Sequence, residues 1–208
     1  MSHRLLPSKR VGAVASTLAL MLLQGAVGAD GAAGESPRPV AKFLDSPLVL
    51  APAVVRDGTP VDGIPAGDMV SGGYHIHSHL TMFVNGVMAW VPAGIGVTRP
   101  VVLDPNRKDP MIVAAQSFYW LHTHDESGVI HAEAPRERAF TLGQFFDVWG
   151  QPLSRHQVGP ARGDVTVLVD GERFAGDPRN IVLKPHELIQ LNVGKDMDFQ
   201  PFTFPPNF

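Results

Sequence analysis

The sequence predicts an α+β fold, in which a mainly antiparallel sheet of β-hairpins carries one short amphipathic helix. Three observations predict it. Apolar and polar residues alternate over several short segments, Asn85-Gly86 and Asp170-Gly171 mark tight turns, and one aromatic stripe has helical spacing. Strand pairs, then one helix, then strands again are typical of such a fold, and a β-grasp-like topology is one arrangement compatible with this order.

The first hairpin is centred on Asn85-Gly86, a dipeptide favoured in two-residue type I′ turns. It predicts strands over 74–84 and 87–91. Because side chains alternate between the two faces of a strand, Leu80 and Met82 lie on a core face. The opposite face of the first strand carries His75, His77 and His79.

The second hairpin joins a strand over 118–124 to one over 129–133 through the loop 125–128. A four-residue loop places His122 directly opposite His131, with their Cβ atoms about 5 Å apart. A loop one residue longer or shorter would move His131 to the other face. The even register is favoured because it gathers the apolar residues Leu121, Ile130 and Ala132 on one face.

A short helix is predicted over 142–149, followed by further strands. Its apolar residues recur at i, i+3, i+4 and i+7, Thr141 is a suitable N-cap, and Gly150 is a suitable stop. We expect the aromatic stripe to be core. A third hairpin turns at Asp170-Gly171, and 187–193 reads as the final strand.

The chain divides into four predicted segments. Residues 1–29 have basic residues, an apolar run and small residues before Asp30, which is the pattern of a signal peptide. Polar residues interrupt the apolar run and argue against a permanent membrane-spanning helix, so we expect no stable membrane insertion after cleavage. Residues 30–68 read as a tether rich in Pro, Gly and Ala, in which part of 41–55 has the apolar character of an edge strand. The histidine-rich α+β domain covers 69–194, and 195–208 is a Pro/Phe-rich tail with aromatics over the domain's surface.

Composition limits the partners and the kinds of site. The chain has 17 Lys and Arg, 20 Asp and Glu, and a formal net charge of −3, and without the basic residues of the leader it is more acidic still. Such a balance, with no basic stripe, argues against nucleic acid as a partner. There is no cysteine, so any metal site must use imidazole, carboxylate and water. Nothing in the sequence indicates an oligomeric state.

Histidines at every second position of two predicted strands indicate a metal site, because neutral imidazole is a common ligand for zinc, copper and iron. On a regular strand the Cα atoms of His75 and His79 are about 13 Å apart, too far for all three histidines of that row to share one ion. His122, His124 and His131 are the better nucleus, with His77 or His79 as a possible fourth ligand. The predicted ligand set is His75, His77, His79, His122, His124 and His131.

Two carboxylates accompany the second row. Glu133 lies on the same face two residues after His131, as a ligand or as a general base for metal-bound water. Asp125 follows His124 in the turn. It can move protons in an enzyme, but its simpler roles are to accept a ring N–H from a ligand or to fix the turn.

The motifs His-Ile-His-Ser-His-Leu at 75–80 and Leu-His-Thr-His-Asp-Glu-Ser-Gly-Val-Ile-His-Ala-Glu at 121–133 carry a resemblance. Together with the segment 140–150, they resemble a group of uncharacterised exported bacterial and archaeal proteins. The resemblance covers roughly 74–194, implies export, and brings no named activity.

Three functions are compatible with these patterns. The first is an extracytoplasmic protein, secreted or periplasmic, that holds zinc or copper(II), with iron also compatible. The second is a metalloenzyme in which a three-histidine ion activates water for hydration or hydrolysis. The third is an interaction module without metal, whose histidines sense acid pH.

Overall fold

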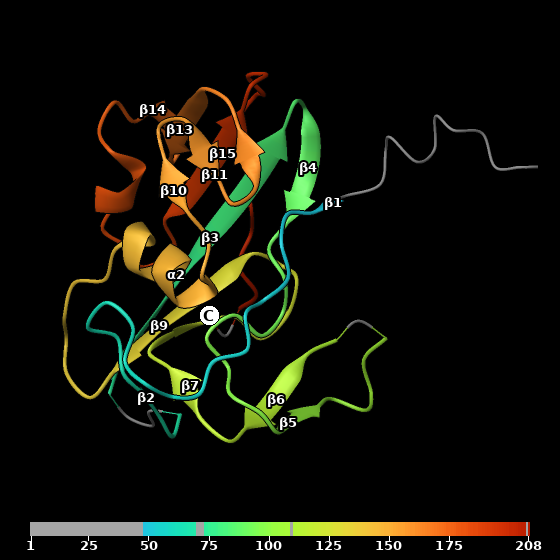
Figure 1. Ribbon diagram of the computed structural model, residues 1–208, viewed down its shortest axis with the longest axis vertical. Helices are drawn as coiled ribbons and strands as arrows, with labels where there is room; N and C mark the ends of the chain where they lie inside the picture. The colour runs from blue at the N-terminus through green and yellow to red at the C-terminus, as the bar shows by residue number, and fades with distance from the viewer. Residues whose placement is uncertain (1–47, 70–72, 109, 207) are drawn as a thin grey trace, which may run out of the picture. The chain divides into compact units, whose positions relative to one another are not determined.

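One long strand, β3 (Tyr74–Val84), organises the main sheet (Figure 1). Along one edge it pairs in parallel with β15 (Leu188–Val193). Along the other edge it pairs antiparallel with β4 (Val87–Trp90) and, further back, with β9 (Val129–Ala134). The start of β3, which carries the histidines, is therefore held next to β9.

The structure is a computed structural model that describes residues 48–69, 73–108, 110–206 and 208, all in a unit that spans 38–208. The remaining strands of the main sheet are β1 (Leu48–Val49), β8 (Leu121–His122), β13 (Val165–Val169) and β14 (Glu172–Arg173). The smaller sheets are formed by β2 (Ala66–Gly67) with β7 (Phe118–Tyr119), β5 (Val101–Leu103) with β6 (Ile112–Ala115), and β10 (Leu153–Ser154) with β11 (Gln157–Val158) and β12 (Ala161–Arg162).

The α+β fold class is confirmed. Among the described strands of the main sheet, β1 with β4 and β15 with β3 are the parallel pairs, and the other pairs are antiparallel. The two predicted two-residue turns, Asn85-Gly86 and Asp170-Gly171, are present. All four residues have positive φ, as type I′ turns require. The β-grasp-like arrangement stays a prediction.

The predicted helix is α2 (Leu142–Trp149). Thr141 and Gln144 form a capping box at its start, and Gly150 ends it in the left-handed conformation. The helix crosses one face of the sheet (Figure 1), and its aromatic side chains are fully buried in the same core cluster as the apolar residues of β3, β8 and β9. As alternation requires, the histidines of these strands then lie on the opposite face.

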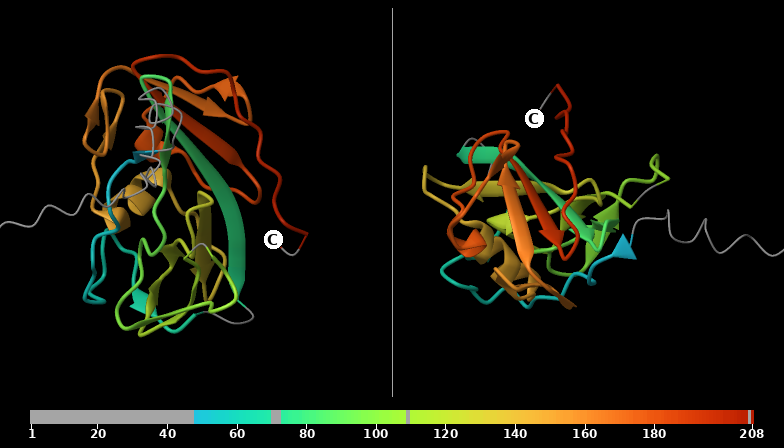
Figure 2. Two further views of the ribbon diagram at one scale, coloured as in Figure 1. Left: turned by 90° about the vertical axis from the view of Figure 1, so that its right-hand side faces the viewer. Right: turned by 90° about the horizontal axis from the view of Figure 1, so that it is seen from above.

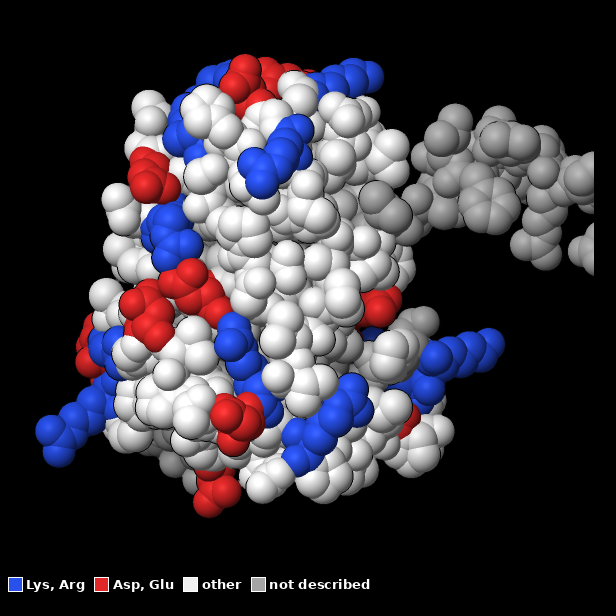
Figure 3. Space-filling model, in the orientation of Figure 1, with Lys and Arg blue, Asp and Glu red and all other residues white. Residues whose placement is uncertain are grey.

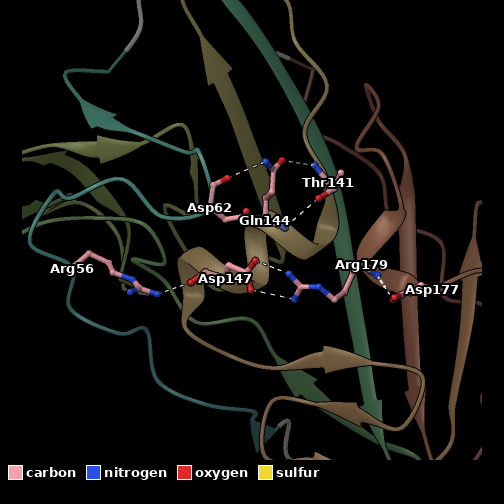
Figure 4. A network of polar contacts seen from close by, with 7 residues as sticks. All are labelled: Arg56, Asp62, Thr141, Gln144, Asp147, Asp177 and Arg179. Atoms are coloured by element: carbon pink, nitrogen blue, oxygen red, sulfur yellow. Dashed lines mark hydrogen bonds and ion pairs between the residues drawn. The ribbon is translucent and has the colours of Figure 1, made fainter.

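The prediction of a tether over 30–68 is wrong for its second half, while 30–47 lies outside the described residues. Leu50 and Ile64 are buried in the core, and β1 pairs with β4 at the sheet edge. Arg56 donates hydrogen bonds to carbonyls at the end of α2, and the Asp62 carbonyl accepts one from Gln144 (Figure 4). A proline-rich composition indicates little regular structure, but it does not prevent the segment from packing against the core.

An ion pair completes this contact network. The guanidinium of Arg179 donates to both carboxylate oxygens of Asp147, at 3.1 and 2.6 Å (Figure 4). It thereby joins α2 to the 3₁₀ helix η1 (Pro178–Asn180), which Asp177 caps. The helix that supports the core face is thus fixed from two directions, by the segment before β3 and by the segment before β15.

The C-terminal segment runs alongside β3 on the face opposite α2 (Figure 2). The side-chain oxygen of Gln190, in β15, accepts a hydrogen bond from the backbone N–H of Gln200. The side-chain nitrogen of Gln190 donates to the carbonyls of Met197 and Asp198. Phe202 stacks on His79 with ring centroids 3.7 Å apart. The predicted placement of the tail aromatics over the domain is confirmed, and they cover the histidine face in particular.

On the face shown in Figure 3, Lys and Arg side chains are interspersed with Asp and Glu and form no continuous basic stripe. The exclusion of nucleic acid stays a prediction from the charge balance. Within the described residues, no helix has the length and apolar character needed to cross a membrane. The predicted signal peptide, 1–29, lies outside these residues.

Candidate metal centre

Three histidines stand in register across three neighbouring strands. His131 of β9 lies directly opposite His77 of β3 on one side and His122 of β8 on the other. The predicted pairing of His122 with His131 is therefore confirmed. The pairing with His77 joins segments more than fifty residues apart, which the sequence left open. His131 is the central residue of the row.

A first histidine triad forms on the β3 side of this row. It consists of His75, His77 and His131, and its donor nitrogens lie within 4.8 Å of one another. The Nδ1 atom of His131 is 3.2 Å from Nε2 of His75 and 3.1 Å from Nε2 of His77. His131 is largely buried, whereas 39% of the His75 side chain is exposed.

A second triad forms on the β8 side from His122, His124 and His131, again with donor nitrogens within 4.8 Å. Nε2 of His122 lies 3.1 Å from Nε2 of His124. The Nδ1 atom of His122 is 2.8 Å from the carbonyl oxygen of Tyr119, and Nδ1 of His124 contacts that of Ile112. A carbonyl only accepts, so each Nδ1 carries the proton and donates it.

These two backbone bonds determine what the facing nitrogens can do. In a neutral imidazole with a protonated Nδ1, the Nε2 atom has only a lone pair, so His122 and His124 point two acceptors at each other. No hydrogen bond can join them. A cation bound by both lone pairs removes the repulsion, and ring N–H bonds to carbonyls are the usual way in which metal-ligating histidines are oriented.

The spacing fits an ion of ordinary size. Two nitrogens of a tetrahedral site, each about 2.05 Å from zinc, are about 3.3 Å apart. The nitrogen separations in the two triads, 3.1 Å and 3.2 Å, are close to that value. Small movements of the rings would accommodate a metal ion in either triad.

Burial favours the neutral form, which is the form that binds metal, at three histidines of the site. Burial, with the neighbouring His124, lowers the pKa of His122 to about 3. Burial, with His75 and other nearby histidines, lowers the pKa of His77 to about 4. The pKa of His131 is also lowered, by burial and by the histidines on both sides.

Glu133 lies beside both triads, as its place in the row predicted. Its Oε1 atom is 3.2 Å from Nε2 of His75 and 3.8 Å from Nε2 of His122, and the residue is almost fully buried. Asp125 has a different place. It accepts hydrogen bonds from the backbone and hydroxyl of Ser127, and its other oxygen is 3.5 Å from Arg107, so it fixes the turn.

His79 is not brought to either triad. Its Nε2 atom is 2.8 Å from the carbonyl oxygen of Ser127, and its ring is stacked beneath Phe202. The strand spacing that argued against three ligands in one row explains this outcome. His156 contacts Asp164 at the surface, and His186 donates to the backbone oxygen of Phe208.

An apolar pocket of about 240 Å³ adjoins the second triad. His124 and His131 form part of its wall, and the rest is mainly apolar, including Met111, Val113 and Phe208. The ring of Phe208 also lies 4.5 Å from that of His77, centroid to centroid. The position of Phe208 and the carbonyls that orient the ligands were not predictable, because they come from segments without a metal-binding pattern.

Comparisons with protein-family models, with curated proteins and with solved structures found no match to this chain. The function therefore has to be argued from the geometry of the site. The resemblance to exported proteins stays a prediction.

In the presence of a chelator, we expect the free energy of unfolding to fall as the pH is lowered from about 6.5 to 5. An unfolded histidine takes up a proton near pH 6.5, whereas the native pKa values of His122 and His79 are about 3 and 4. The unfolded state then binds more protons, so each such group removes up to about 1.4 kcal/mol per pH unit. Urea denaturation at several pH values measures this slope. A His79→Asn variant should have a shallower slope, and a flat wild-type profile would contradict the neutral, buried state of these rings.

Proposed function

We propose that this protein is an extracytoplasmic metal-binding protein that holds zinc or copper(II) through strand-borne histidines. The observation that carries the proposal is the pair His122 and His124, whose Nε2 atoms face each other at 3.1 Å while both Nδ1 atoms donate to carbonyls. The export of the protein is inferred from the signal-peptide pattern of residues 1–29.

The ligand types favour these two ions over others. Both triads consist of imidazole, a donor suited to zinc and copper(II), and the chain has no cysteine that would select copper(I). A two-histidine, one-carboxylate set with Glu133 keeps iron compatible. Copper(II) binds most nitrogen sites more tightly than zinc does, so which metal the protein holds also depends on the supply of each metal around it.

The test is zinc and copper(II) titration of the full chain, purified without a histidine tag, against a competing chromophoric chelator. We expect tight binding by the wild type. In His124→Ala we expect the affinity of the His122/His124/His131 triad to fall by more than about 100-fold, because removing a ligand costs more than removing a residue that only orients a ligand. His156→Ala is the matched control, since its ring lies at the surface, and should bind as the wild type does. Absence of binding in the wild type would overturn the proposal and favour the pH-sensitive module.

A metalloenzyme is the second candidate, and the pocket beside His124 and His131 favours it. A three-histidine ion leaves a coordination position for water or substrate, and here a cavity adjoins two histidines of the second triad. Glu133, whose Oε1 lies 3.8 Å from Nε2 of His122, would be the general base that accepts a proton from water bound to such an ion.

Cobalt(II) substitution tests whether the ion is accessible. We expect azide to change the visible absorption of the cobalt-loaded protein by entering the open position. Val113→Trp, which narrows the pocket without altering a ligand, should weaken that response. An unchanged spectrum at saturating azide would rule out an open position and leave the carrier role.

A further inference from the structure

We propose that the site holds two metal ions and that the imidazole ring of His131 bridges them. The proposal rests on the metal-binding function proposed above and extends it from one triad to both. It begins with the observation that the nitrogens close enough to share an ion form two groups in the described part of the chain, and that His131 belongs to each.

The two groups approach His131 from opposite sides. His75 and His77 come from β3, which pairs with one edge of β9. His122 comes from β8, on the other edge, and His124 follows two residues after it. Neighbouring strands are about 4.8 Å apart, so the two pairs start about 10 Å from each other on the sheet. One ion with bonds of about 2.1 Å cannot reach both pairs unless the rings move together.

An imidazole has two ring nitrogens, so one ring can serve two ions. Nδ1 of His131 faces His75 and His77, at 3.2 and 3.1 Å. In the proposed bridge, Nδ1 of His131 binds the first ion together with His75 and His77. Its Nε2 atom binds the second ion together with His122 and His124. When both nitrogens are coordinated the ring proton leaves to solvent, and His131 becomes an imidazolate with one negative charge.

The surroundings suit a pair of ions. Glu133, almost fully buried, has its Oε1 atom 3.2 Å from one member of the first triad and 3.8 Å from one member of the second. Its carboxylate and the imidazolate together would offset part of the charge of two divalent cations. A buried location makes such an offset valuable, because charges are poorly screened there.

The experiment counts ions and reads their coupling with copper(II). The full-length wild type, loaded with copper and freed of excess metal by gel filtration, should hold two ions per chain. An imidazolate bridge couples their unpaired electrons, so the low-temperature EPR signal should integrate to well below two spins. His75→Ala and His124→Ala each keep one triad, and each should hold one ion with an ordinary uncoupled signal.

His131→Ala should remove the coupling and weaken both ions. Because His131 is buried, that variant can fail to fold, and the comparison of His75→Ala and His124→Ala with the wild type then decides. One ion per chain in the wild type, or two ions with two full uncoupled spins, would overturn the bridge while leaving the proposed metal binding intact. No bound copper at all would overturn both proposals.

Discussion

The candidate site depends on the register in which β9 lies between β3 and β8. Pairing of His131 with His77 on one edge and with His122 on the other brings both histidine rows to one centre. A slip of one residue in either pairing would turn the histidines towards the core and the apolar residues towards the tail. The core face opposes such a slip, since Ile130, Ala132 and Leu121 are almost fully buried beneath α2. The packing of the core therefore specifies which face carries the histidines.

Local signals in the sequence were sufficient to predict the turns, the short-range hairpins and the helix. The Asn85-Gly86 turn predicted the first hairpin, the even register predicted the alignment of His122 with His131, and the capping residues predicted the helix. The strand expected over 118–124 is shorter, since β7 and β8 end at Tyr119 and His122. Pairings between distant segments were not predictable, because alternation identifies faces but not neighbours. The parallel contact of β15 with β3 and the antiparallel contact of β9 with β3 are of this kind. The packing of 48–69 against β4, β7 and the end of α2 also joins segments that are distant in the sequence.

Burial disfavours protonation of the central histidines of the candidate site. Its central histidines are removed from water, so their protonated forms are disfavoured, and backbone carbonyls orient His122 and His124. A metal ion satisfies the facing lone pairs without requiring any protonation. The tail completes this enclosure, since Phe208 lies against His77 and lines the adjoining pocket. The same features suit a carrier and an enzyme, and access to the ion through the pocket separates the two.

The most direct measurement of the central claim is the location of the metal in crystals of the zinc-loaded protein, by anomalous scattering at the zinc absorption edge. The account predicts a strong peak about 2.1 Å from Nε2 of both His122 and His124. A peak confined to surface groups such as His156 and Asp164, or no peak near the facing nitrogens at full zinc occupancy in solution, would contradict it.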